Sequence, residues 1–243
     1  MPVIDVHWHL VAGMDTCQEA VQQVNECGRG GITAAVTCIM DNFGQDRETM
    51  SKLVPPWGWK WLARLELSRV PVTMKLLQED TRCRIIPFLD IRSATDPDSL
   101  CLEEYAKQGF GGLKLLYIPV GDRAVEISSI PRTLGISKER FQRVYYEAVV
   151  QAASLGWPVL IHVDLTRDGS FARKLLEDFP EVKFNIAHLG YSRKEMKNFL
   201  AEYPHCFSDL AALASFMLDD GDGVTTQPPC ASLKNSTGLG SAY

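Results

Sequence analysis

Val3-Ile4-Asp5-Val6-His7-Trp8-His9-Leu10 is a short, largely apolar stretch that contains a His-x-His pair. Val3, Ile4 and Val6 favour a buried β-strand. Because alternate side chains of a strand share a face, we expect His7 and His9 to point the same way, about 7 Å apart along the backbone. Two imidazoles so placed can bind one metal ion if other segments supply further ligands. Without such ligands they are ordinary strand histidines, so the interpretation depends on the other strands.

Six further apolar segments follow along the chain. They span residues 32–40, 84–91, 111–117, 158–164, 182–190 and 206–211. They are apolar almost throughout rather than alternating, which is typical of a parallel sheet whose outer face is covered by helices. Seven strand–helix units predict an α/β fold of the (β/α)8 TIM-barrel type that lacks its eighth strand unit. A doubly wound open sheet is the alternative, and it is disfavoured because no Gly-x-Gly-x-x-Gly turn follows the first strand.

Capping residues mark where several helices begin. Thr16-x-x-Glu19 and Ser192-x-x-Glu195 are capping boxes, and Asp96-Pro97 supplies an N-cap and a first-turn proline. Ser137 begins a strongly amphipathic helix that ends at Gly156.

The chain divides into a body and a tail. We expect one barrel domain over residues 1–218, with a helical excursion at 41–82 that is too long for a plain connection. The excursion contains Trp57, Trp59 and Trp61, which either help to cover a site or simply pack it onto the body. Residues 219–243 are rich in Asp, Gly, Thr, Ser and Pro, and they predict a flexible C-terminal tail.

Composition excludes several classes of function. The 243 residues carry a net charge of −5, which gives no sign of a nucleic-acid partner. No apolar run is long enough to cross a membrane, and the N-terminus has no signal-like core. The seven cysteines form no C-x-x-C pair, so we expect reduced thiols and a cytoplasmic location.

Four of the five histidines lie in predicted strands or at their C-terminal ends: His7, His9, His162 and His188. The active sites of barrels of this kind are found at that end. Neutral imidazole is a good ligand for zinc and other late first-row divalent ions. A bound divalent ion lowers the pKa of water to about 7 and so provides a nucleophile at neutral pH. We therefore expect a metal centre built from these four histidines, most simply with one zinc ion.

The ordered motifs VIDVHWH, GGLKLLY, LIHVD, NIAHLG and FSDLA resemble those of the amidohydrolase superfamily, in particular its amidohydrolase-related branch of metal-dependent hydrolases and decarboxylases. The resemblance covers Val3 to about Leu213. It implies a metal held by His7, His9 and His162, with His188 as the catalytic residue that activates water or polarises the substrate. In two-metal relatives the residue equivalent to His188 is itself a ligand, and a carbamylated lysine, here Lys114, bridges two ions. Alternatively, Lys114 holds a substrate carboxylate or faces solvent.

The chain departs from this family pattern near its C-terminal end. The family places an aspartate that binds metal at the end of an eighth strand, and no eighth strand can be drawn here. Asp209 follows His188 by 21 residues, which is one strand–helix–strand step, so it belongs to the seventh strand. Asp219, Asp220 and Asp222 follow a helix and suit a solvated turn better. The chain therefore has the pattern of a truncated family member. If metal nevertheless binds tightly, Asp209 is the first candidate for a fourth ligand.

Three functions remain open from the sequence. The first is a metal-dependent hydrolase that acts on a C–N, ester or lactone bond of a small molecule. The second is a metal-dependent non-oxidative decarboxylase of a small organic acid, which a cation such as Lys114 or Arg123 would favour by holding the carboxylate. The third is a catalytically impaired homologue that acts as a binding protein. Open sheet edges would also allow a homo-oligomer.

Overall fold

The computed structural model describes residues 3–11, 22, 25–26, 28, 31–59, 84–122 and 124–211. Most of the predicted helix after Thr16, residues 60–82 of the excursion, Arg123 and residues 212–243 lie outside the described residues.

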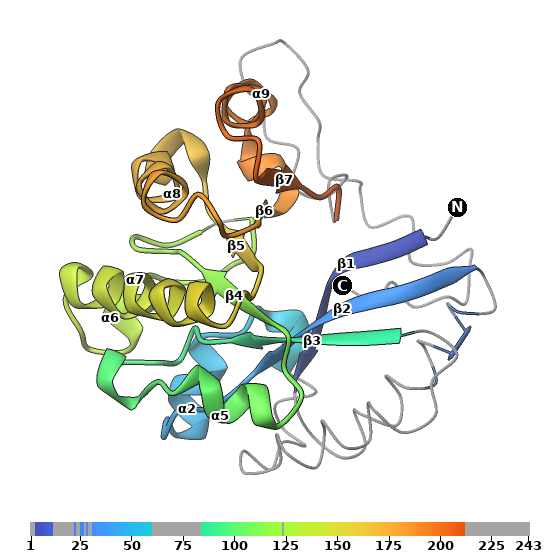
Figure 1. Cartoon of the computed structure of the whole chain (residues 1–243). Helices are drawn as coiled ribbons and strands as arrows, with labels where there is room; N and C mark the ends of the chain where they lie inside the picture. Colours follow the sequence, from blue (N-terminus) through green and yellow to red (C-terminus); the bar gives the residue numbers. More distant parts are fainter. Residues whose placement is uncertain are drawn as a thin grey trace, which may run out of the picture.

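Seven parallel strands form one sheet in the order of the chain, curled into a half-barrel with helices between the strands (Figure 1). The strands are β1 (Val3–Val11), β2 (Ile32–Met40), β3 (Arg84–Asp90), β4 (Gly112–Leu116), β5 (Val159–His162), β6 (Phe184–Ile186) and β7 (Cys206–Ser208). The sheet and the strand–helix alternation confirm the predicted barrel-type fold. In the described part of the chain, β1 and β7 are the two ends of the sheet.

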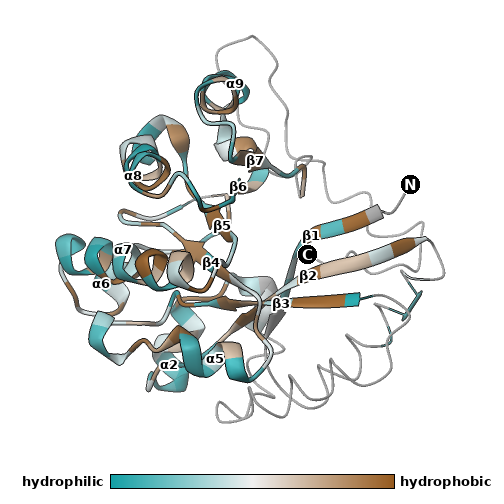
Figure 2. Ribbon diagram, in the orientation of Figure 1, coloured by the Kyte–Doolittle hydropathy of each residue, from teal (hydrophilic) through white to brown (hydrophobic). Residues whose placement is uncertain are grey.

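The inner strands of the sheet are apolar because both of their faces are buried, whereas β1 and β7 at its ends expose Ile4, Val6 and Phe207. One set of side chains, including Leu113, Leu115 and Ile161, joins the large core between the sheet and the helices. A smaller cluster of Val36, Cys38, Phe88, Leu160 and Ala187 fills the concave side. Figure 2 shows the matching pattern, since β4 and β5 are mostly hydrophobic whereas α7 (Lys138–Ser154) and α8 (Leu165–Asp178) carry residues of both kinds. This double burial explains why the strand segments lack polar alternation.

The longer helices begin and end where their capping residues predict. The Ser137 side chain accepts a hydrogen bond from Arg140 N at the start of α7, and Gly156 follows its end with φ of +66°. Ser192 accepts from Glu195 N at the start of α9 (Arg193–Glu202). Asp164 caps α8 through Thr166 N and Arg167 N.

Shorter elements fill the connections. They are α2 (Arg47–Lys52), η1 (Pro56–Gly58), η2 (Pro97–Ser99), α5 (Leu102–Lys107) and α6 (Ile130–Thr133). Asp96 caps only the single turn of η2, and α5 then begins at Leu102. The helix predicted from Asp96-Pro97 is therefore split in two, because Leu100 takes an extended conformation between the parts.

The sixth and seventh strands end earlier than the sequence predicts. β6 stops at Ile186, and His188, Leu189 and Gly190 adopt left-handed backbone angles with φ of 53–58° within η3 (Ala187–Tyr191). A Cβ at Gly190 would lie 2.3 Å from Leu165 Cγ, so the tight turn requires glycine. β7 stops at Ser208, which leaves Asp209 just beyond the strand. Both changes place polar residues at the C-terminal ends of the strands.

Candidate metal centre and adjoining pocket

His7 and His9 lie on the same face of β1, as strand alternation predicts. Their Nε2 atoms are 3.0 Å apart, and their rings are tilted at 53° with centroids 4.9 Å apart. Burial lowers the pKa of both imidazoles well below the usual value, and the nearby charge of Lys114 lowers each further. Both rings are therefore neutral at pH 7, the form that ligates metal.

β2 and β4 bring two more polar groups to this pair. Cys38 is the register partner of His9 across the β1–β2 ladder and is 1% exposed. Lys114 is fully buried, and its Nζ lies 3.1 Å from His7 Nε2. Burial lowers the pKa of the Lys114 amine and raises that of the Cys38 thiol to about 12.

Asp209 approaches the other nitrogen of His7. Its Oδ2 lies 3.3 Å from His7 Nδ1 and accepts a hydrogen bond from Asn185 Nδ2 at 2.8 Å. Its Oδ1 accepts from the backbone amides of His188 and Ala211, each at 3.1 Å. The His7 Nδ1 contact lacks hydrogen-bond geometry, so this buried nitrogen has no hydrogen-bond partner among the described residues.

His188 lies beside both residues. Its ring stacks on that of His7 with centroids 4.8 Å apart, and its Nδ1 lies 2.5 Å from the carbonyl oxygen of Ala211. Because a carbonyl only accepts, Nδ1 carries the proton and Nε2 carries the lone pair. Burial is the main cause that lowers the pKa of His188 to about 3, with His162 and Lys114 contributing.

His162 is held by two residues that sequence reasoning missed, Asp122 and Tyr191. Its Nε2 lies 3.1 Å from Asp122 Oδ2 and 3.0 Å from the Tyr191 hydroxyl. Burial lowers the pKa of His162, so the neutral ring donates from Nε2 and has only Nδ1 to offer an ion. Burial opposes ionisation of Asp122, but hydrogen bonds from His162, Tyr191 and Ala124 N lower its pKa to about 2.

Two groups of side chains bring their donor atoms within 4.8 Å of one another, which is close enough to share an ion. One is His7, His9 and Cys38, and the other is His7, His188 and Asp209. His162, which the resemblance implied as a ligand, is in neither group. These neutral imidazoles, the thiol and the carboxylate are donors that zinc accepts, and the orphaned His7 Nδ1 is a buried polar atom that still needs a partner. The residues present therefore fit a divalent ion.

Two aspartates at the ends of β3 and β5 have partners other than the histidines. Asp90 is buried and accepts from Arg92 Nε at 3.0 and 3.1 Å, while Arg92 Nη1 donates to the carbonyl of Leu53. Asp164 caps α8 instead of contacting a histidine. The Asp90–Arg92 pair fixes the end of β3, which lies in register with Lys114.

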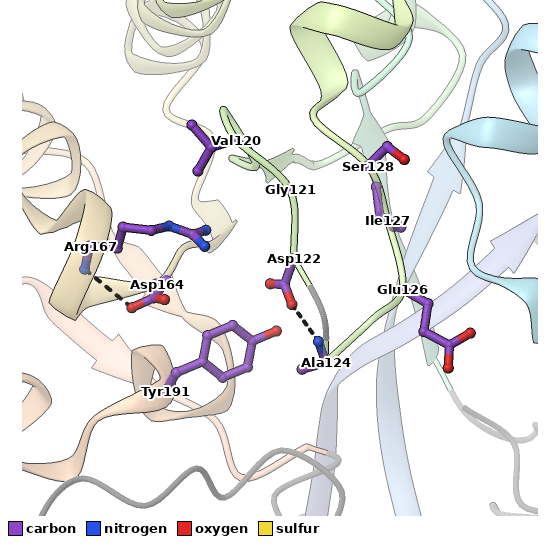
Figure 3. A pocket seen from close by; sticks show the side chains of 10 residues that line it. All are labelled: Val120, Gly121, Asp122, Ala124, Glu126, Ile127, Ser128, Asp164, Arg167 and Tyr191. Atoms are coloured by element: carbon purple, nitrogen blue, oxygen red, sulfur yellow. Dashed lines mark hydrogen bonds between the residues drawn. The ribbon is translucent and has the colours of Figure 1, made fainter.

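Figure 3 shows a pocket of about 680 Å³ whose lining includes Asp122 and Tyr191, the two residues that hold His162. One wall comes from the segment between β4 and α6, another from the start of α8, and Tyr191 of η3 completes it. Asp122 and Tyr191 both line the pocket and contact His162, so the pocket opens beside the candidate centre. The Arg167 guanidinium is directed into it, with Nε donating to Asp168. The space is large enough for a small-molecule substrate.

A family model described as amidohydrolase matches residues 84–240, and the chain therefore belongs to the amidohydrolase family. The family supports a hydrolase or related metal-dependent function. No curated protein matches the chain. Among the described residues, no helix has both the length and the apolar surface needed to cross a membrane.

The chain is similar in fold to a solved TIM-barrel structure. An uncharacterised TIM-barrel protein, Bb4693 from Bordetella bronchiseptica, is 13% identical with a TM-score of 0.54, over 91% of this chain and 79% of that chain. PhdJ bound to a substrate intermediate is 10% identical with a TM-score of 0.39, over 88% and 67%. Dihydropteroate synthase from Xanthomonas albilineans is 12% identical with a TM-score of 0.34, over 88% of each chain. The first likeness confirms the barrel-type fold, and the other two are too distant to carry an argument.

Proposed function

We propose that the protein is a metal-dependent hydrolase that cleaves a C–N, ester or lactone bond of a small molecule. The observation that carries the proposal is a pair of donor clusters that share His7, beside a pocket: His7 with His9 and Cys38, and His7 with His188 and Asp209. Neutral imidazoles, an acidic group and a concave space for substrate are the parts that metal-assisted hydrolysis needs.

His7 and His9 would hold the ion, most simply a single zinc, on the Nε2 side of His7. Asp209 faces the other ring nitrogen of His7, where it forms a second cluster of donor atoms with His188. When bound, a divalent ion supplies Lewis acidity, which polarises a carbonyl and lowers the pKa of water to about 7. Lys114 is near enough to the centre to bridge a second ion if it were carbamylated, and that remains the alternative to a single ion.

His188 is the residue we assign to proton transfer. Its Nδ1–H donates to the Ala211 carbonyl, which fixes the ring and leaves the lone pair on Nε2. In that form the ring can accept a proton from the attacking water and return it to the leaving group. Asp209 holds the same residue through its backbone amide, so the carboxylate positions His188.

His162 connects the centre to the pocket. Asp122 and Tyr191 hold its ring from the pocket side, which fixes the ring's orientation. A substrate in the pocket would therefore lie against the residues that orient His162.

Non-oxidative decarboxylation of a small organic acid is the second candidate. It needs a cation to hold the substrate carboxylate, and Arg167 directs its guanidinium into the pocket. Lys114 lies at the centre itself, whereas Arg123 lies outside the described residues. A catalytically impaired binding protein is the third candidate, and it would bind metal without turnover.

Two measurements test the proposal. The first is the metal content of protein purified without chelator, and the second is an activity assay on a panel of esters, lactones, amides and carboxylic acids. His7→Ala and His9→Ala should each lose metal and turnover together, because the two Nε2 atoms face one another. His205→Ala is the matched control, since His205 contacts the Leu176 carbonyl before β7. Metal retained in both single variants would overturn the assignment, and metal without turnover on any substrate would favour the binding protein.

A further inference from the structure

We propose that Cys38 is a ligand of the metal, so that the ion is held by a thiolate together with His7 and His9. This inference rests on the proposed metal-dependent function. It adds a soft sulfur donor that the histidine pattern of the sequence does not include.

The β1–β2 register places Cys38 at the centre. Cys38 is directly paired with His9, so both residues occupy one level of the sheet. The Cys38 sulfur and one ring nitrogen from each of His7 and His9 lie within 4.8 Å of one another. Typical zinc bonds of about 2.3 Å to sulfur and 2.0–2.1 Å to nitrogen place two such donors about 3.6 Å apart in a tetrahedral site. Small side-chain adjustments would therefore bring all three donors to one ion.

The two ring nitrogens of His7 face different neighbours. Nε2 faces His9 Nε2 at 3.0 Å, whereas Nδ1 faces Asp209 at 3.3 Å. A ligating histidine usually presents its other ring nitrogen to a carboxylate or carbonyl. With the ion on the Nε2 side, Nδ1 carries the proton and faces the Asp209 carboxylate, and Cys38 is the next donor available to the ion.

The charges at the centre also favour a thiolate. Lys114 Nζ lies 3.1 Å from His7 Nε2, so a divalent ion there would be repelled by any proton that the Lys114 amine carries. A negatively charged sulfur offsets that repulsion. On binding, the S–H bond of Cys38 breaks, the sulfur–metal bond forms and the proton is released to solvent.

A thiolate donor makes the site selective for the kind of metal ion that it binds. Sulfur ligands favour zinc over magnesium and manganese, which prefer oxygen donors. We therefore expect zinc or cobalt(II), but neither magnesium nor manganese(II), to occupy the centre when each is offered alone to metal-free protein.

Cys206 provides a matched control. It is also buried, and burial likewise raises the pKa of its thiol to about 12. However, Cys206 begins β7, packs in the core between sheet and helices, and its sulfur contacts the Phe207 carbonyl. Cys38→Ser and Cys206→Ser therefore make the same chemical change at two buried strand positions, and only the first is at the centre.

The test uses cobalt(II) and zinc as the probes. Cobalt-loaded protein should show a near-ultraviolet sulfur-to-metal charge-transfer band, which Cys38→Ser abolishes and Cys206→Ser retains. Zinc affinity of Cys38→Ser should fall by more than the roughly 10–100-fold that loss of an outer hydrogen-bond partner costs. X-ray absorption of the zinc-loaded wild-type chain should show one sulfur at about 2.3 Å, which needs no folded variant.

The possible outcomes distinguish failure of the Cys38 assignment from failure of the proposed hydrolase function. Metal bound at full stoichiometry without the charge-transfer band or the sulfur shell would overturn the role of Cys38 while leaving the proposed hydrolase intact. A band that persists in Cys38→Ser would also overturn it. Failure to bind any divalent ion would remove both proposals together.

Discussion

The Asp122 carboxylate lies 3.1 Å from Nε2 of His162, although forty residues separate the two along the chain. The same carboxylate accepts a hydrogen bond from Ala124 N at 2.8 Å. The pair thus joins the loop after β4 to the end of β5 and fixes which nitrogen of His162 carries the proton.

Replacing Asp122 with Asn should therefore destabilise the protein in a pH-dependent way. The folded-state pKa of Asp122 is lowered to about 2, so its stabilisation is present above the unfolded pKa near 3.8 and is lost as the pH falls through about 2. Asp122→Asn should reduce the free energy of unfolding by on the order of 1–2 kcal/mol at pH 7. Urea unfolding measures this, with the exposed Asp98→Asn as control, and equal stability of Asp122→Asn and wild type at pH 7 would contradict the contact.

Asp209→Asn should weaken metal binding without removing it. The substitution keeps an oxygen that can accept from the His188 amide but removes the charge facing His7 Nδ1. As an outer partner, Asp209 should account for roughly 10–100-fold in metal affinity, measured by competition with a chelating dye. A complete loss of metal would instead make Asp209 a direct ligand, with the ion on the Nδ1 side of His7.

Whether Lys114 is carbamylated determines whether the centre holds one metal ion or two. We expect one ion for each chain and no mass gain from a carbamyl group in native mass spectrometry, because a buried amine beside His7 Nε2 already has a polar contact. Lys107→Ala, which removes an exposed lysine paired with Glu103, is the control. Two ions in the wild type and one in Lys114→Ala would show that a carbamylated lysine bridges them.

Metal-free protein should lose stability as the pH falls below about 6.5. The pKa values of His7, His9, His162 and His188 are all lowered by burial, so these rings stay neutral when folded and take up protons on unfolding. The unfolded state then binds more protons, and each ring costs about 1.4 kcal/mol for each pH unit well below 6.5. Melting temperatures of chelator-treated protein from pH 7.5 to 5 should fall steeply, and His188→Asn should flatten the slope. A melting temperature independent of pH over that range would show that the rings are not buried as described.

The local sequence determined the elements and one part of the centre. The apolar strands follow from double burial, and Ser137 and Ser192 mark helix starts through hydrogen bonds within three residues. His7 and His9 share a face because strand alternation is a local property. Counting residues assigned Asp209 to the seventh strand, but β7 ends at Ser208 and Asp209 lies just beyond it.

The tertiary structure decided how these parts meet. Cys38 and Lys114 reach His7 only through the register of parallel strands far apart in sequence, and that register follows from packing. Asp122 and Tyr191 hold His162 from loops, where side-chain direction has no fixed period. His188 lies in a left-handed turn that also includes Gly190, and Gly190 lies close to Leu165 only once α8 packs against η3.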